Sequence, residues 1–428
     1  MPFIDFSVNL LFKSKRGVSI FVMHRQVTGV LHKAFGFINR IFTGRPDKFT
    51  VICRALMATA LGLFLSTCLV QPLSMTTSAM FSSPDKRDFQ LPDLYAQIAD
   101  NRPVRSFDDR VVIVNIGRNG REEIAEALST LALCGPKAVG LDVIFFEPSN
   151  DDSFLIEALE NTPNLIMPLG VSARKENGLF QIEDKPFFYD ECQNINYGVV
   201  NLPLSSEKGT VREFAVDFPT NQGVIPSFVT ALAEKSFPEA AKKLKERKAE
   251  TGITAYHSRE YQVVNLEDIE DHAEDFADKI VLIGALEDAG DMHATPVQSH
   301  VAGVMLHAAA LSTILDGTWI EKVPKRYDYI LAVGLCLAIM LIVYGFKSNF
   351  RGFVLRIIQA SMVYLAVRIG YALFVDHDTI FDISFTVTIV AFGLFAADIW
   401  NSIEALWSIC SKKIAKLDAK FNPQSQLC

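Results

Sequence analysis

Four stretches of the chain are apolar over the length that a membrane-spanning helix requires. They cover residues 51–70, 329–346, 353–374 and 380–397. A helix needs about 20 mostly apolar residues to cross the hydrocarbon core of a bilayer. The pattern therefore predicts four transmembrane helices, one before and three after a long intervening segment.

The basic residues around these stretches predict the orientation of the chain. Residues 1–49 contain eight Lys or Arg, the loop after the second stretch contains Lys347 and Arg351, and residues 401–428 contain four lysines. The loop between the third and fourth stretches contains no Lys or Arg. Because Lys and Arg accumulate on the cytoplasmic side of membrane proteins, we expect both termini in the cytoplasm and residues 71–326 outside.

This topology divides the chain into five parts. They are a basic amphipathic cytoplasmic leader (1–49), a transmembrane helix (50–70), an extracytoplasmic domain (71–326), three transmembrane helices (327–400) and a cytoplasmic tail (401–428). A cleaved signal peptide is the alternative for the first helix, but the leader is far longer than the basic region of a signal peptide.

Both cytoplasmic parts contain amphipathic patterns. Residues 26–42 place apolar side chains at helical spacing and basic side chains between them. Such a helix is expected to lie on the anionic membrane surface, with packing against a partner protein as the alternative. Residues 402–419 predict a second amphipathic helix.

The intervening segment has the pattern of an α/β domain. Residues 110–117 and 138–146 are continuous apolar runs rich in β-branched residues, as expected for strands buried on both faces. Between them, residues 121–134 repeat apolar positions at helical spacing, and Gly135 and Pro136 end the helix. This order is typical of a βαβ unit with parallel strands.

Further elements complete this domain. We expect strands at 165–169, 211–218 and 279–285, helices at 152–161, 226–235 and 305–315, and a charged helical stretch at 238–250. The first and last strands are expected to share one sheet. The predicted fold class is an α/β extracytoplasmic domain with a mainly parallel sheet, plus a four-helix transmembrane region with one helix before the domain and three after it.

Composition and charge support this organisation. Half of the 428 residues are hydrophobic and 21% are charged, which excludes a disordered chain. Residues 71–326 contain 24 basic and 40 acidic residues, whereas the remainder contains 17 and 9. An acidic central block with basic residues beside the apolar stretches indicates a membrane protein, and we expect no nucleic-acid partner.

Several polar residues fall near predicted strand ends, where α/β sheets bind ligands. Asp142 lies in one strand-end region, Asp291 and His293 follow another strand, and His307 lies in the helix after them. Such groups could bind a cation or a polar ligand, although capping and core packing are the alternatives. Arg212 suits a carboxylate or phosphate ligand, with an internal salt bridge as the alternative.

Two other residue pairs invite interpretation. Arg368 and Asp382 fall within predicted transmembrane helices, where charges are costly. They are expected either to pair with each other or to reach the outer surface separately. Cys134 and Cys192 are the only cysteines of residues 71–326. An oxidising compartment would allow a disulfide between them, and buried free thiols are the alternative.

The sequence resembles a known family of sensory domains. The segments that carry the resemblance are residues 111–117, 140–145, 197–203, 209–212, 226–232, 279–285, 291–296, 303–307 and Ala310. Together with the three closing apolar stretches, they resemble the second type of CHASE domain over residues 75–400. The resemblance implies an extracytoplasmic sensory domain of bacteria that passes a signal across the membrane.

The expected function follows from this resemblance. Members of the family typically continue into a cyclase, kinase or phosphatase domain, whereas only a short tail follows residue 400 here. We therefore expect a bacterial inner-membrane sensor that is not an enzyme, binds no cofactor, contacts membrane lipid and relays an unknown signal to a separate signalling partner. The alternative is a structural or assembly component of the cell envelope. Homo-oligomers are compatible with either function.

Overall fold

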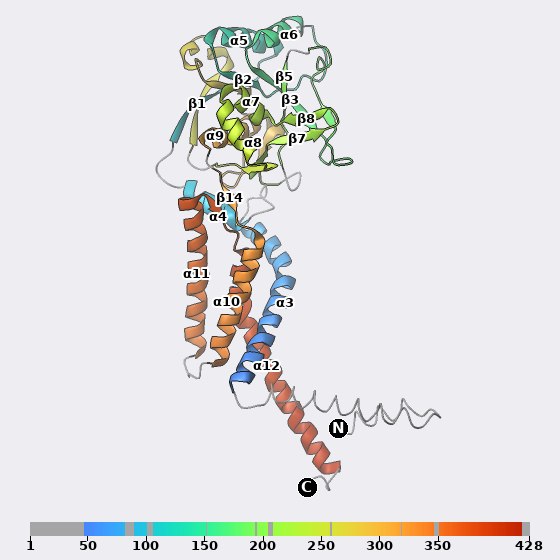
Figure 1. Ribbon diagram of the computed structural model, residues 1–428, viewed down its shortest axis with the longest axis vertical. Helices are drawn as coiled ribbons and strands as arrows, with labels where there is room; N and C mark the ends of the chain where they lie inside the picture. The colour runs from blue at the N-terminus through green and yellow to red at the C-terminus, as the bar shows by residue number, and fades with distance from the viewer. Residues whose placement is uncertain are drawn as a thin grey trace, which may run out of the picture. The chain divides into compact units, whose positions relative to one another are not determined.

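The computed structural model describes most of the chain outside its first 46 residues. The described residues are 47–81, 90–100, 106–150, 152–192, 195–203, 209–256, 259–317, 319–345 and 351–421. The amphipathic helix predicted at 26–42 lies outside them. The chain divides into a helical unit and an α/β unit, and the α/β unit includes residues 73–323 and 369–382 (Figure 1).

A mixed, mostly parallel sheet forms the centre of the α/β unit. Its strand order is β10-β1-β11-β2-β3, and all four neighbouring pairs are parallel. β5 also pairs with β3 in parallel, whereas β4 is antiparallel to it. The strands are β1 (Ser106–Asn115), β2 (Ala138–Leu141), β3 (Leu165–Val171), β4 (Ile182–Asp184), β5 (Asn196–Val199), β10 (Arg259–Asn265) and β11 (Ile280–Gly284).

The position of β11 confirms that the two ends of the domain share one sheet. β11 lies between β1 and β2, which are neighbours in sequence. β1, α5 (Arg121–Cys134) and β2 form the expected strand–helix–strand unit, and α6 (Asp152–Asn161) has the predicted bounds.

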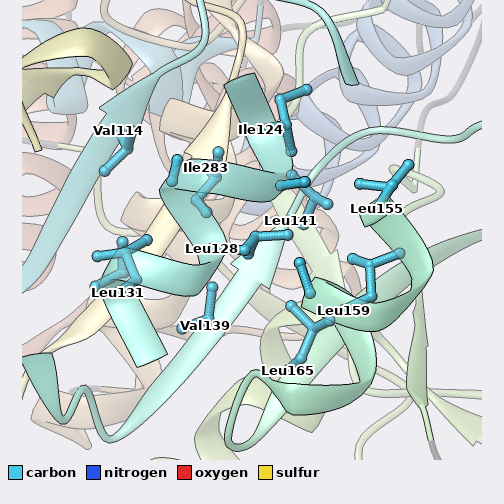
Figure 2. Close-up of a cluster of buried hydrophobic side chains, with 14 of the residues drawn as sticks. Val114, Ile124, Leu128, Leu131, Val139, Leu141, Leu155, Leu159, Leu165 and Ile283 are labelled. Carbon is cyan, nitrogen blue, oxygen red and sulfur yellow. The ribbon is translucent and has the colours of Figure 1, made fainter. Parts of the chain in front are cut away.

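Helices cover both faces of the sheet, as the buried strands require. Val112 and Val114 of β1 face one core with α5 and α6, whereas Val111 and Ile113 face the other core. Figure 2 shows the first core, in which Leu128 lies among side chains of the sheet and both helices. The second core contains α7 (Phe228–Ser236), α8 (Pro238–Glu246) and α9 (Gly303–Asp316).

Some predicted bounds were wrong. The strand predicted at 138–146 ends at Leu141, because its neighbour β11 ends at Gly284. The single strand predicted at 211–218 is two strands, β6 (Glu213–Ala215) and β7 (Asp217–Thr220), which pair with different partners. α7 begins after Ser227, whose side chain accepts a hydrogen bond from the Thr230 amide at its N-terminus.

The described residues also form four two-stranded sheets. β6 pairs with β9 (Thr251–Ile253), β7 with β8 (Gly223–Pro226), β12 (Met292–His293) with β13 (Val301–Ala302), and β14 (Glu321–Lys322) with β15 (Thr379–Ile380). The 3-10 helices η1 (Leu266–Asp268), η2 (Ala273–Asp275) and η3 (Ala289–Asp291) and the helix α4 (Leu91–Asp100) complete the unit.

Four helices of the described chain are long and apolar enough to cross a membrane. They are α3 (Lys48–Phe81), α10 (Lys325–Gly345), α11 (Arg351–His377) and α12 (Ser384–Phe421). α12 is one continuous helix, so the predicted last span and the predicted tail helix are not separate elements.

Small residues and one buried carboxylate organise the helical unit. A Cβ added to Gly62 of α3 would lie 3.5 Å from the Ala396 Cβ of α12, so the two helices approach closely there. The Asp328 carboxylate of α10 accepts hydrogen bonds of 3.1 and 3.0 Å from the Phe385 and Thr386 amides. It therefore satisfies backbone donors that the first turn of α12 leaves without helical partners.

Candidate functional site

Four of the five predicted ligand residues come together at the strand ends. The Asp142 amide, directly after β2, donates to the Ile283 carbonyl of β11 at 2.8 Å. The His307 Nε2 atom of α9 lies 3.8 Å from the Asp142 Oδ2 atom. The His293 Nε2 atom lies 3.0 Å from the Asp291 Oδ1 atom. The structure thus places these four candidate residues in two Asp–His pairs, a proximity that their spacing in the sequence could not show.

Asp142 is the most perturbed acid of this group. Burial raises the pKa of its carboxyl and the nearby Asp291 adds to the increase, whereas His307 and His293 oppose it. The Phe228 ring packs against the His307 ring at a centroid distance of 5.1 Å. Asp142 and His307 therefore form a largely buried acid–imidazole pair between the sheet and α9.

The cavity that His307 lines is small. His307 lines a cavity of about 20 Å³, which is the size of roughly one water molecule. The Asp291 Oδ2 atom accepts a hydrogen bond of 3.1 Å from the Gly303 amide, and thus caps the start of α9. Among the described residues, no cluster of three or more His, Cys, Asp or Glu could hold a metal ion. Ligand binding at this group stays a prediction.

Arg212 lies elsewhere and forms an internal salt bridge. Its Nε and Nη2 atoms donate to the two carboxylate oxygens of Asp93 in α4, at 2.8 and 2.7 Å. Both side chains are largely buried. A two-pronged guanidinium–carboxylate pair of this kind fixes geometry strongly, so Arg212 attaches α4 to the rest of the unit.

An ionic cluster at the opposite end of α9 was not predicted from the sequence. The buried Asp108 carboxylate accepts from the Arg110 Nε atom at 2.8 Å and from the Ser312 hydroxyl at 2.6 Å. Arg110 and Arg259 both pair with Asp316, the last residue of α9. Burial alone would raise the pKa of Asp108, but the hydrogen bonds from Arg110 and Ser312 lower it to about 2.

The only signal for this cluster in the sequence was the charged run before the β1 core. Asp108, Asp109 and Arg110 precede the apolar residues of the strand. The register of β1 against β10 shifts between Phe107 and Val112. This irregularity could not be predicted from a run of three charges.

A second unpredicted feature joins the end of the domain to the loop between α11 and α12. The Val323 amide donates to the Ile380 carbonyl, and the Glu321 amide donates to the Asp378 carbonyl, each at 2.9 Å. We call residues 321–323 and 378–380, which include β14 and β15, the linker bridge.

Side chains fasten the linker bridge to the domain. The Glu321 carboxylate accepts from the Arg247 guanidinium at 2.6 Å, and Lys322 pairs with Glu213 of β6. The Tyr95 ring of α4 also lies 6.3 Å from the Phe374 ring near the end of α11. The segment 369–382 is therefore part of the α/β unit.

The remaining predicted pairs have different outcomes. Cys134 and Cys192 are free thiols that contact the same hydrophobic core, so the structure contains no disulfide between them. Burial raises the pKa of both thiols. Arg368 and Asp382 belong to different units, and their pairing stays a prediction.

Two ion pairs within the helical unit were missed. Arg54 of α3 contacts Glu404 of α12 at 3.1 Å, and Arg356 of α11 contacts Asp398 of α12 at 3.0 Å. Glu404 lies in the region that the sequence assigned to the tail. The sequence did not indicate the pairing of Glu404 with Arg54, because the predicted last membrane helix ended before Glu404.

Comparison with known proteins identifies the family. No curated protein and no solved structure matches the chain. The model of the CHASE2 domain matches residues 75–343, more than half of the chain. The match includes the main sheet, the helices on both of its faces and the β14 strand. The chain therefore belongs to the CHASE2 domain family, a family of extracytoplasmic sensory domains.

Proposed function

We propose that the chain is a multi-pass sensor of the bacterial inner membrane. Its α/β unit senses a signal outside the cytoplasm, and the helices α3, α10, α11 and α12 relay the signal to a separate cytoplasmic partner. Membership in the CHASE2 family and the four apolar helices support this function. The proposal assigns the chain no catalytic activity.

The topology of the proposal rests on charge. The segment before α3 is rich in Lys and Arg and the last part of α12 contains four lysines, whereas the loop between α11 and α12 has neither residue. These biases favour one helix before the domain and three after it, with both termini in the cytoplasm.

The linker bridge is the observation that carries the relay. β14 leads through Val323 and Pro324 into α10, and β15 lies between α11 and α12 in the sequence. Because the two strands are hydrogen-bonded, a displacement of β14 acts on the ends of three membrane helices. A ligand transmits a signal only if it changes the balance between two arrangements, and we propose that the bridged and unbridged linkers are these arrangements.

The Asp108 cluster connects the sheet to the end of α9, which precedes the linker bridge in the sequence. Asp316 ends α9 and is held by Arg110 and Arg259, so the helix end cannot move without breaking these ion pairs. We therefore propose that a displacement of the sheet or of α9 also displaces β14. An interaction of Arg368 with Asp382 would stabilise one of the two arrangements.

The relay is tested by breaking the linker bridge and observing the C-terminal part of α12 after residue 400, which we call the tail. Val323→Pro removes the amide that donates to Ile380. The full chain is placed in lipid nanodiscs and carries a maleimide spin label on Cys410, which is exposed, with its other cysteines replaced by alanine. We expect two spectral components in the parent chain and a changed ratio in the variant.

Lys322→Gln is the matched control, because it keeps the backbone hydrogen bonds of the bridge. Trp319 fluorescence checks that the domain remains folded in each variant. An unchanged spectrum in a folded Val323→Pro variant would contradict the relay. That outcome would favour a structural or assembly component that uses the sensory fold without transmitting a signal.

A further inference from the structure

The α/β unit contains a large pocket at the carboxyl ends of β3 and β5. Its volume is about 550 Å³, within the usual range of about 300–1,000 Å³ for small-molecule sites. The Asn201 side chain, which lines it, accepts from the Val171 amide at 2.6 Å and donates to the Val171 carbonyl at 2.8 Å. The two strand ends are thus fixed together at the position where α/β sheets bind ligands.

One wall of the pocket is apolar. The Phe180 and Phe218 rings meet edge to face with centroids 5.3 Å apart. Phe218 and Val171 are buried members of a small core, and Phe180 packs against this core. Val224 of β8 lines the pocket but keeps 68% of its surface exposed. An apolar ligand group would therefore gain contact with two aromatic rings and cover an exposed valine.

Among the described residues, three lysines line the pocket, and they differ in their acidic partners. Lys245 pairs with Glu234 and lies 3.6 Å from Asp217. Within the described part of the chain, Lys175 and Lys248 form no ion pair. The Lys175 ammonium lies 5.2 Å from the Phe180 ring centroid.

The acidic lining does not cancel this charge. Asp217 and Glu250 are the acids that line the pocket. Asp217 is already beside Lys245, and Glu250 is exposed, as are Lys175 and Lys248. Residues 71–326 carry 40 acidic against 24 basic residues, so a pocket with more lysines than acids differs in charge from the domain around it.

We propose that this pocket binds a small organic monocarboxylate with an aromatic or branched apolar body. Lys175 and Lys248 hold the carboxylate, and the body packs on Phe180, Phe218 and Val224. That this binding is the sensed signal rests on the proposed function, whereas the binding itself does not.

Fluorine NMR of the full chain in nanodiscs tests the site. The probe is para-trifluoromethyl benzoate, and its neutral amide and the corresponding benzylamine are the matched comparisons. The amide and the amine lack the negative charge that the lysines would hold, so we expect both to bind at least about tenfold more weakly. Empty nanodiscs measure partition of each probe into lipid.

Variants locate the bound probe. The double substitution Lys175→Gln and Lys248→Gln should weaken benzoate binding at least about tenfold. Val224→Ala, at an exposed position that the fold does not require, should also weaken it. Lys235→Gln, on the exposed side of α7, is the charge-matched control and should leave binding unchanged.

Equal binding of benzoate and amide, preference for the amine, or unchanged affinity in the double lysine variant would each overturn the proposed site. The spin label on Cys410 separates this inference from the relay. Saturable benzoate binding with an unchanged tail spectrum would contradict the relay and leave the pocket standing. A tail that responds to Val323→Pro, without benzoate binding, would contradict the pocket alone.

Discussion

The backbone amide of Val323 donates a hydrogen bond of 2.9 Å to the carbonyl oxygen of Ile380. The two residues are far apart in sequence, yet both lie next to the start of a membrane helix, α10 and α12. Their contact turns the end of the α/β unit and the loop after α11 into one hydrogen-bonded element. The proposed relay depends on this element.

The Asp108 cluster predicts a specific pH dependence. The folded pKa of Asp108 is about 2, below the value of about 3.9 for an unfolded aspartate. The resulting stabilisation is present above about pH 4 and is lost as the pH falls towards 2. Urea unfolding followed by Trp319 fluorescence, with Trp400 and Trp407 replaced by phenylalanine, measures this loss.

Asp108→Asn is the test of that assignment. The variant should be less stable than the parent at neutral pH and should lose less stability on acidification, because it lacks the titrating carboxyl. An identical pH dependence in parent and variant would show that other carboxyls cause the loss.

Two leucines of α5 test the core shown in Figure 2. Leu128 is fully buried, whereas Leu133 is 90% exposed on the same helix. Leu128→Ala should lower the free energy of unfolding by about 2–5 kcal/mol, because it removes buried methyl groups and leaves a cavity. Leu133→Ala should have little effect. Similar losses in both variants, measured by urea unfolding, would contradict the packing of α5.

The Arg212–Asp93 pair should show strong coupling. Replacing either residue alone, by Arg212→Met or Asp93→Asn, should destabilise the unit by about 2–4 kcal/mol, because a largely buried charge loses its partner. The double variant should lose less than the sum of the two single losses. Additive losses in this cycle would mean that the two side chains do not stabilise each other.

Chemical labelling tests the orientation in the membrane. With all other cysteines replaced by alanine, Leu133→Cys places a thiol at an exposed site of the α/β unit. It should react with a membrane-impermeant maleimide on intact cells whose outer membrane is permeabilised. Cys410 alone, near the end of α12, should react only after lysis. The reverse pattern would contradict the predicted topology.

The sequence predicted those elements whose pattern is set locally. α5 and α6 matched their predicted bounds because apolar spacing and end signals lie within each segment. β10 was missed because it is an edge strand whose side chains are mostly polar or half exposed. β6 and β7 were merged because their separation depends on different partners: β6 pairs with the distant β9, whereas β7 pairs with β8, which follows it directly.

The candidate site was predictable in part for the same reason. Parallel strands end at a common edge, which made Asp142 and the residues after β11 candidates for one site. The distance of 3.8 Å between Asp142 and His307 of α9 could not be predicted from their sequence positions. The Asp93 partner of Arg212 and the linker bridge join segments separated by more than 50 residues. No local pattern of apolar and polar residues specifies such pairs.

The most direct test of the relay locks the bridge that Val323→Pro breaks. Glu321 and Thr379 are direct neighbours in the parallel pair, and neighbouring strands lie about 4.8 Å apart, close enough for a disulfide. Glu321→Cys with Thr379→Cys is introduced into the chain that carries the maleimide spin label on Cys410. Each single cysteine variant is the control.

Oxidation, which forms the disulfide, should increase the component of the Cys410 spin-label spectrum that Val323→Pro decreases. Reduction of the disulfide should restore the ratio of the two components seen in the parent chain. The single variants should not respond to either treatment. A tail spectrum that is identical in the locked, reduced and broken chains would contradict the claim that the linker bridge transmits a signal.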